Sequence, residues 1–533
     1  MLKSKISDIL LLLFGLFWMV FVFSDYINKH PFYGISVEHF QFRNYALFII
    51  VYVLIHGTIF HFGKEKLGKY LFNGLGVTAS IFVAAVATTY SYINFSDGVN
   101  NFGSAMVFAG NAIKYLAALV LIFISVSSIG NLTFQLVNFD IRESSRSIYE
   151  VVFGIMVITL IMFLLAMLAV LNQITVLAFI LLPIIINYKS NIKLVKTLFI
   201  SPLAPKFKNL NFLTGVLLST LILFLTINFL GAMSPFPLGF DSRNYYVNIS
   251  KLLEDYNGVV KGFQSYSWSI FMAIGNIAFK SMTLTLLLSF SGILLSLWAL
   301  WELARNYIHL RINQSLAAIL IVSLMPAFFN QMYIELKVDF GLLFVQVCNL
   351  LLLIDTVDNI TKGDKFRFDS DLYKLLILLG VFFGFALGIK ATHLYMIFAI
   401  MMFLWTVYCQ FYGFLACFSA IFSLILFGHL DDVSGMGSYH IGSYYLKYIL
   451  LASTFVFGAL SFVKYREAFL ASLKTSVIVS VISLLVFMPW VLKHYTESKT
   501  TNINSLIIGN NPGPEITIWE IIENYNKSKK GNE

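Results

Sequence analysis

The stretch PLGFDSRNYY, residues 237–246, decides how the rest of this chain is interpreted. It places a carboxylate, Asp241, and a guanidinium, Arg243, shortly after a long apolar segment that ends at Ala232. The residues before it have the pattern of helices that cross a bilayer, and further apolar runs follow it. The stretch therefore predicts a polar site at the surface of a membrane.

The composition is that of a membrane protein. Of the 533 residues, 59% are hydrophobic and 12% are charged, whereas soluble domains are about half apolar and about a quarter charged. Apolar runs long enough to span a hydrocarbon core of about 30 Å recur along the chain, and we count about fifteen. The sequence therefore predicts an all-α polytopic membrane protein with about 14–15 transmembrane helices. The runs begin near Asp8, Ala46, Gly76, Ile113, Tyr149, Ile174, Asn211, Met282, Ser315, Val338, Tyr373, Thr392, Phe411, Tyr444 and Ser476.

The net charge of +9 is spread over short loops and marks no single basic face, so we expect no nucleic-acid partner. If Lys3 and Lys5 are cytoplasmic, every second connection returns to the cytoplasm, and most of these connections are basic, as the positive-inside rule requires. This alternation places Asp241 outside the cytoplasm. The basic residues of these connections are Lys64, Lys66, Lys69, Arg142, Arg146, Lys189, Lys193, Lys196, Lys206, Lys208, Arg305, Arg311, Lys362, Lys365, Arg367, Lys464 and Arg466.

We expect three parts along the chain. Residues 1–210 form N-terminal transmembrane helices, as a scaffold or an added module, residues 211–492 form a transmembrane core, and residues 493–533 form a short extracytoplasmic tail. The core contains a long outside loop at 233–281, in which Asp241 or Ser242 is suited to cap a helix. Apolar residues at helical spacing over 245–256 predict an amphipathic helix that lies flat on the membrane, and residues 266–271 repeat this interfacial character.

Two further charged clusters follow. Glu335, Lys337 and Asp339 lie at the outer end of a predicted span, and the two acids share a face if this segment is helical. Gly380, Gly384 and Gly388 form a stripe of small residues suited to close helix packing, and the stripe ends near Lys390 and His393. The three cysteines have neither a disulfide pattern nor a metal-ligand spacing.

The acidic outside loop, the cluster at 335–339 and the glycine-rich helix that ends in Lys390 together resemble the GT-C glycosyltransferases, in particular the protein-mannosyltransferase-like members that use polyprenyl-phosphate sugars. The resemblance covers residues 212–410. It implies a GT-C-like core in a bacterial inner membrane, an extracytoplasmic active site, a lipid-linked sugar donor and a glycan, lipid or protein acceptor. The chain departs from the family pattern because many apolar runs precede the loop, and because Ser242 stands where a paired acid is usual.

Inverting transfer from a lipid phosphate needs a base for the acceptor hydroxyl and cations for the departing phosphate. We assign Asp241 as the base, and Arg243, Lys337 and Lys390 as phosphate partners. Glu335 and Asp339 are expected to orient the acceptor or to bind a divalent cation, the one cofactor that we consider, and His393 is grouped with the substrate-binding residues.

Each of these residues also has a plainer interpretation. Asp241 is suited to a purely capping role, the two lysines are suited to reach from helix ends to the interface, and the two acids are suited to pair with them. His393 then serves as an ordinary interfacial histidine. A polysaccharide polymerase or ligase, a lipid-linked oligosaccharide flippase or transporter, and a structural membrane scaffold remain as alternative functions.

Overall fold

A computed structural model describes residues 74–93, 101–137, 142–197, 212–325, 328, 331–332, 335–362, 368–427 and 445–498. Every regular element in these ranges is a helix, and nine of the helices are long and apolar enough to cross a membrane, or ten if one bent pair counts as a span. The prediction of an all-α, multi-pass membrane protein is confirmed. The predicted runs that begin near Asp8 and Ala46 lie outside the described residues, so the total of about 14–15 spans stays a prediction.

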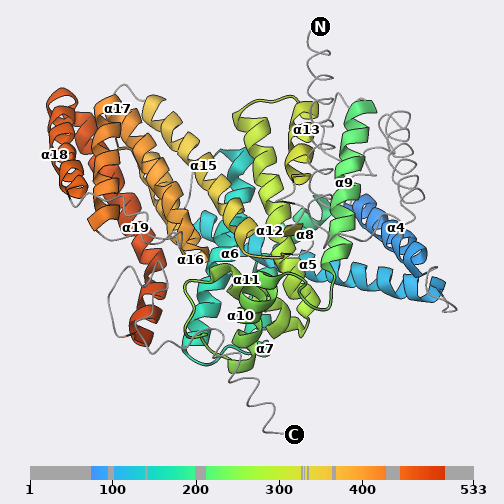
Figure 1. Cartoon of the computed structure of the whole chain (residues 1–533). Coiled ribbons are helices and arrows are strands. Elements are labelled where there is room, and N and C mark those ends of the chain that lie inside the picture. The colour runs from blue at the N-terminus through green and yellow to red at the C-terminus, as the bar shows by residue number, and fades with distance from the viewer. Residues whose placement is uncertain are drawn as a thin grey trace. The chain divides into compact units, whose positions relative to one another are not determined.

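The described chain divides into two compact units, and Figure 1 labels their helices. The first contains the described residues of Met1–Val259 and Ser267–Leu351, and the second those of Val260–Tyr266 and Leu352–Glu533. Helix α15 (Asp339–Lys362) begins in the first unit and ends in the second. The other helices of the first unit are α4 (Gly74–Ile93), α5 (Asn101–Val137), α6 (Glu143–Met167), α7 (Gln173–Ile186), α8 (Tyr188–Val195), α9 (Phe212–Ala232), η4 (Ser242–Tyr246), α10 (Val247–Tyr256), α11 (Ser267–Phe279), α12 (Met282–Glu302), η5 (Leu303–Tyr307) and α13 (Ile312–Ser323).

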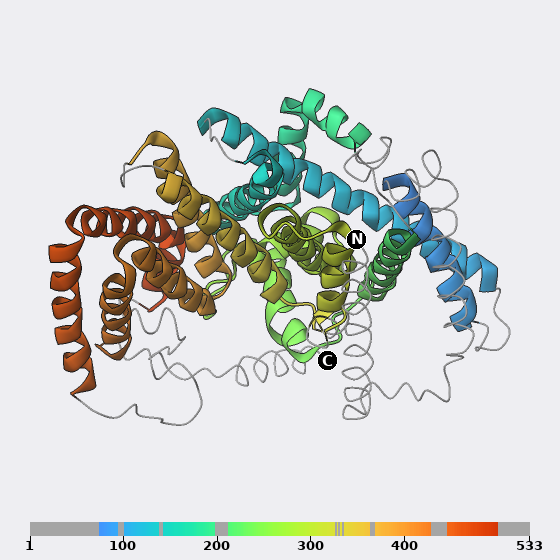
Figure 2. The same ribbon diagram turned by 90° about the horizontal axis from the view of Figure 1, so that it is seen from above.

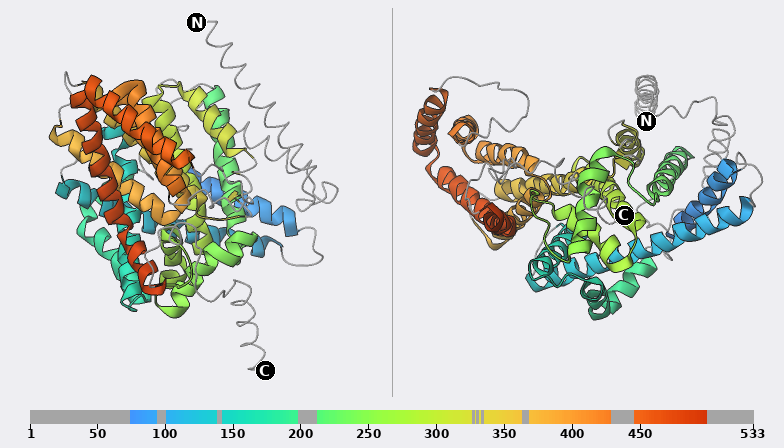
Figure 3. Two further views of the ribbon diagram at one scale, coloured as in Figure 1. Left: turned by 60° about the vertical axis from the view of Figure 1, so that its left-hand side comes forward. Right: turned by 60° about the horizontal axis from the view of Figure 1, so that its bottom comes forward.

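The helices before residue 210 pack in the same unit as α9 to α13. Helices α4 and α5 lie side by side in the right-hand view of Figure 3, and α7 and α8 form the bent pair, with an angle of 85° between them. Polar contacts join α6 to η5 and to the end of α12: the hydroxyls of Ser145 and Tyr307 are 2.8 Å apart, and Ser145 also donates to Glu302 at 3.3 Å. The Arg142 guanidinium lies 4.5 Å from the centre of the Tyr307 ring. These contacts attach the N-terminal helices to the membrane core.

The two loop helices pack against each other. Helix α10 forms where an amphipathic helix was expected, but its apolar residues Val247, Ile249 and Leu253 are buried in protein, and Ser250 donates to the Ser269 carbonyl of α11 at 2.8 Å. Helix α11 is buried on all sides. The apolar face of α10 is therefore covered by α11, which is itself buried around its whole circumference, and the placement of the two helices on the membrane surface stays a prediction.

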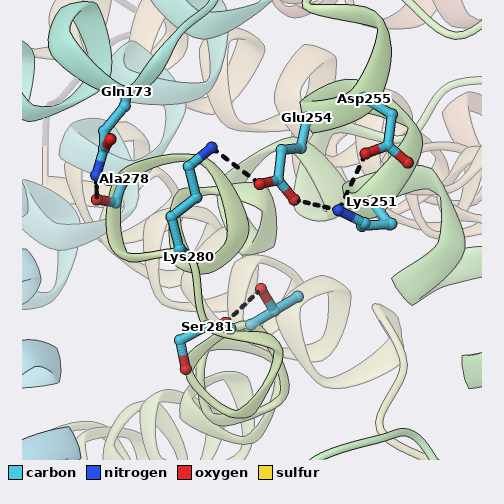
Figure 4. A network of polar contacts seen from close by, with 8 residues as sticks. Gln173, Lys251, Glu254, Asp255, Ala278, Lys280 and Ser281 are labelled. Atoms are coloured by element: carbon cyan, nitrogen blue, oxygen red, sulfur yellow. Dashed lines mark hydrogen bonds and ion pairs between the residues drawn. The ribbon is translucent and has the colours of Figure 1, made fainter.

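An ion-pair network fixes the end of α10 (Figure 4). Glu254 accepts hydrogen bonds from Lys251 at 2.8 Å and from Lys280 at 2.9 Å, and Lys251 also pairs with Asp255 at 3.0 Å. Lys280 lies in the turn between α11 and α12, and it has a left-handed backbone with φ of 51°. The network therefore ties the loop helix to the beginning of a membrane-spanning helix.

The second unit contains the segment Val260–Tyr266, the end of α15 and four more long helices. These four are α16 (Ser370–Ile389), α17 (Leu394–Phe427, after the 3-10 turn η6, Ala391–His393), α18 (Leu446–Lys464) and α19 (Arg466–Ser498), orange to red in Figure 2. Any Cβ on Gly380 or Gly384 would overlap atoms of α19, which confirms the predicted close packing at these two glycines.

Helix α17 is sharply kinked part-way along its length. Its backbone leaves the helical region at Cys409 and at Gln410, where φ is 54°. A Cβ on Gly413 would overlap the Trp405 carbonyl eight residues earlier, which no straight helix with a rise of about 1.5 Å per residue permits. The break falls between the two apolar runs predicted to begin near Thr392 and Phe411.

Candidate functional site

A π turn shapes the backbone after Asp241. The Val247 N–H donates to the Ser242 carbonyl, five residues earlier, so η4 is wound more widely than an α-helix. Residues five apart then lie on one side of the turn, which brings the side chain of Tyr246 to the same side as Asp241. Within this turn Ser242 is fully buried, whereas the Asp241 side chain is 51% exposed.

Asp241 does not cap the helix. Its side chain makes no capping hydrogen bond and pairs with Lys337, whose Nζ lies 2.5 Å from its Oδ2. The capping position is occupied by Glu335, whose Oε2 accepts from the Ser242 N–H at 3.2 Å and from the Ser242 hydroxyl at 3.1 Å. A carboxylate more than ninety residues away thus satisfies the helix start, and Asp241 is left free of that structural task.

Helices α11 and α12 hold the segment that carries Lys337. Ser289 donates to the Lys337 carbonyl at 2.7 Å, and Ser296 donates to the Phe340 carbonyl at 2.8 Å. Gly341 lies against the ring of the fully buried Trp268 so closely that no Cβ fits between them. The position of the lysine is therefore set by buried helices.

The expected shared helical face of Glu335 and Asp339 is not formed. Residues 335–338 are not helical, and α15 begins only at Asp339, whose carboxylate lies in the first helical turn. A carboxylate there interacts favourably with the positive end of the helix dipole. The two acids instead approach the site from a loop and from a helix start.

The three carboxylates change the ionisation of their neighbours. Burial opposes the charge of Lys337, but the hydrogen bond to Asp241 and the negative charges of Asp241, Glu335 and Asp339 outweigh it, so the pKa of Lys337 is raised. Burial, together with the same three carboxylates and against the opposing effect of Lys337, raises the pKa of Tyr246 to about 12. Lys337 is therefore a cation and Tyr246 a neutral hydrogen-bond donor at physiological pH.

An open hollow of about 390 Å³ lies beside this cluster and is lined by Phe236, Pro237, Leu238 and Arg243. The Arg243 side chain is exposed and makes no hydrogen bond or ion pair with any residue that the structure describes. Apolar walls and this unpaired guanidinium suit a ligand that has a hydrocarbon part and an anionic group.

The predicted site residues fall into two groups. Asp241, Arg243, Glu335, Lys337 and Asp339 come together in the first unit, whereas Lys390 and His393 belong to the second. Lys390 follows α16 in an extended conformation, and its carbonyl accepts from the His393 N–H at 3.1 Å. The His393 ring is fully buried, with its centre 5.7 Å from that of Phe383. The binding roles of Lys390 and His393 stay predictions.

Three contributors were not predicted from the sequence: Tyr246, Ser289 and Ser296. Ser289, Gly292 and Ser296 recur at the spacing of one helix face, which was a readable signal that another segment approaches α12 closely. The π turn that brings Tyr246 to the site has no comparable sequence signal.

Among the described ranges, no group of three or more His, Cys, Asp or Glu side chains is arranged to hold a metal ion. No protein-family model, curated protein or solved structure matches the chain.

Proposed function

We propose that the protein is a membrane glycosyltransferase that moves a sugar from a polyprenyl-phosphate donor to an extracytoplasmic acceptor, with inversion at the anomeric carbon. The charge alternation of the loops supports an outward-facing site, as in a bacterial inner membrane. The proposed GT-C architecture and the divalent cation considered above belong to this hypothesis.

One observation carries the proposal. Asp241 is half-exposed and has no capping role, and it lies two residues from Arg243, whose side chain lines an apolar hollow and is unpaired among the described residues. Both residues follow the end of the spanning helix α9. A lipid-linked sugar has three parts that match these groups in order: a hydrocarbon chain for the apolar hollow, a phosphate for the guanidinium and a sugar near the carboxylate. A carboxylate beyond the phosphate is then placed to meet the acceptor hydroxyl.

The reaction follows from these positions. The acceptor oxygen forms a bond to the anomeric carbon, its proton passes to Asp241, and the bond between that carbon and the phosphate oxygen breaks. Polyprenyl phosphate leaves with one more negative charge than it had in the donor diester. Arg243 and Lys337 stabilise this developing charge, because fixed cations act most strongly where charge appears in the transition state.

Lys337 has a second part in the proposal. Lys337 is paired with Asp241 through Nζ and Oδ2, so this carboxylate oxygen is already occupied by an ammonium proton. A donor phosphate competes for the same ammonium and releases Asp241 to accept a proton. Base and donor are thereby coupled through one side chain.

The test measures release of polyprenyl phosphate by purified protein in nanodiscs, with a panel of polyprenyl-phosphate hexoses and pentoses. We expect Asp241→Asn to lower turnover by about a hundredfold to ten-thousandfold, since a general base commonly contributes that much. Asp255→Asn is the matched control, because Asp255 is also 51% exposed and lysine-paired on the same loop. Lys337→Met should weaken donor binding and turnover together. Full turnover in the Asp241 variant, or equal losses in both Asp variants, would refute the assignment of the base.

A further inference from the structure

Three large apolar side chains project from the segment between α9 and the π turn. Phe236 is 60% exposed, Leu238 is 48% exposed and Phe240 is 69% exposed. They alternate with Pro237, which is partly buried, and Gly239, which is buried. Three such residues on five consecutive positions form a compact apolar patch, whereas single exposed apolar residues are common on any protein.

The patch is held at the ends of two spanning helices. It begins four residues after Ala232, the last residue of α9, and the Ser234 carbonyl accepts from the Thr283 hydroxyl at the start of α12, at 3.1 Å. The Ser234 hydroxyl donates to the Phe236 carbonyl at 2.6 Å and fixes the turn that projects this side chain. Because the ends of spanning helices lie at the edge of the hydrocarbon layer, the patch lies at that depth as well.

Polar groups follow the patch without a gap. The Arg243 N–H donates to the Gly239 carbonyl at 2.9 Å, so the guanidinium is carried on the same short piece of backbone as Phe240. Aromatic and aliphatic side chains followed by a cation match the order of acyl chain and phosphate in a lipid leaflet. In a loop of the same length surrounded by water, exposing this much apolar surface would be unfavourable.

We infer that Phe236, Leu238 and Phe240 form a wedge that inserts into the acyl chains of the bilayer, with Arg243 at the level of the lipid phosphates. The occupant of the patch is lipid and not a second protein chain, because its position is set by the ends of α9 and α12. The wedge fixes the depth of the neighbouring Asp241. This contact does not depend on the transferase proposal, and it holds for any function of the site.

The experiment measures depth directly. A nitroxide label is placed at residue 236, 238 or 240, and at Asn248 as control, in a chain whose three cysteines are replaced by alanine and which is reconstituted at one copy per phospholipid nanodisc. Asn248 is exposed on α10 of the same loop. Collision rates with oxygen, which concentrates in lipid, and with a water-soluble nickel chelate are then compared by power saturation.

We expect oxygen to dominate at all three wedge positions and the nickel chelate to dominate at 248. Dominance of the nickel chelate at the wedge would show that the patch faces water, and low access to both reagents would show that protein covers it; either result overturns the inference. Monodisperse elution of each labelled variant confirms that it is folded. Because no donor is present, the depth measurement and the turnover assay of Asp241→Asn fail or succeed independently.

Discussion

The hydrogen bonds between Glu335 and Ser242 make a prediction whose size follows from the structure. The carboxylate accepts two hydrogen bonds, at 3.2 Å and 3.1 Å, from a residue with no exposed surface. Hydrogen bonds to a charged group contribute about 1.5–3 kcal/mol and neutral ones about 0.5–1.5 kcal/mol. Glu335→Gln keeps an acceptor but removes the charge, so it should lower the free energy of unfolding by about 1–3 kcal/mol.

Glu335→Ala should cost more, because both Ser242 donors then stay buried without a partner, at about 1–3 kcal/mol each. The decisive measurement is a double-mutant cycle of Glu335→Gln with Ser242→Ala. The free energy of unfolding of each variant is measured by SDS-driven unfolding in mixed micelles. We expect a coupling energy of about 1 kcal/mol, since the second substitution removes one of the two donors.

Ser250→Ala provides the matched control for this cycle. Ser250 is also fully buried and belongs to the adjoining helix, but its hydroxyl donates to Ser269 and not to Glu335. Its effect should add to that of Glu335→Gln within about 0.5 kcal/mol, as expected for residues without a shared contact. Strict additivity of the Ser242 and Glu335 substitutions would mean that Glu335 does not hold the helix start, and the separation of roles between Glu335 and Asp241 would then fail.

Two further perturbations test the packing around the site. Gly341→Ala should destabilise the protein by about 1–3 kcal/mol, because the new Cβ overlaps the Trp268 ring, whereas Gly458→Ala, where nothing lies within 4 Å, should be neutral or stabilising; equal unfolding midpoints would contradict this packing. Burial opposes the charge of Glu254, but the hydrogen bonds and charges of two lysines outweigh it and lower its pKa below 4.5. A lowered pKa contributes stability that is complete above the ordinary value and is lost as the pH falls through the lowered one. The unfolding midpoint should therefore fall in acid less steeply in Glu254→Gln than in the parent chain, and parallel pH curves would show that the network of Figure 4 does not stabilise α10.

The sequence by itself determined the class of the protein and the approximate place of its site. Long apolar runs can be satisfied only as helices in a bilayer, and this requirement acts on each run separately. Close packing at the glycines of α16 was also predictable, because a stripe of small residues indicates that another helix packs closely there, whichever helix it is. The charged residues at 241, 243, 335, 337 and 339 were recognised for a similar local reason: charge is rare within apolar runs, so clusters of charge at their ends are conspicuous.

Only the tertiary structure decided which parts of the protein these helices and charged residues contact. Lipid and protein interior are both apolar, so the pattern of α11 could not distinguish a helix on the membrane from one buried in protein. The partner of a helix start is equally invisible locally: Ser242 is capped by Glu335, and Asp241 is thereby left to pair with Lys337, through contacts that span more than ninety residues. Periodicity reports which side of a helix is apolar, whereas burial and pairing depend on elements that are distant in the chain and are brought together by packing.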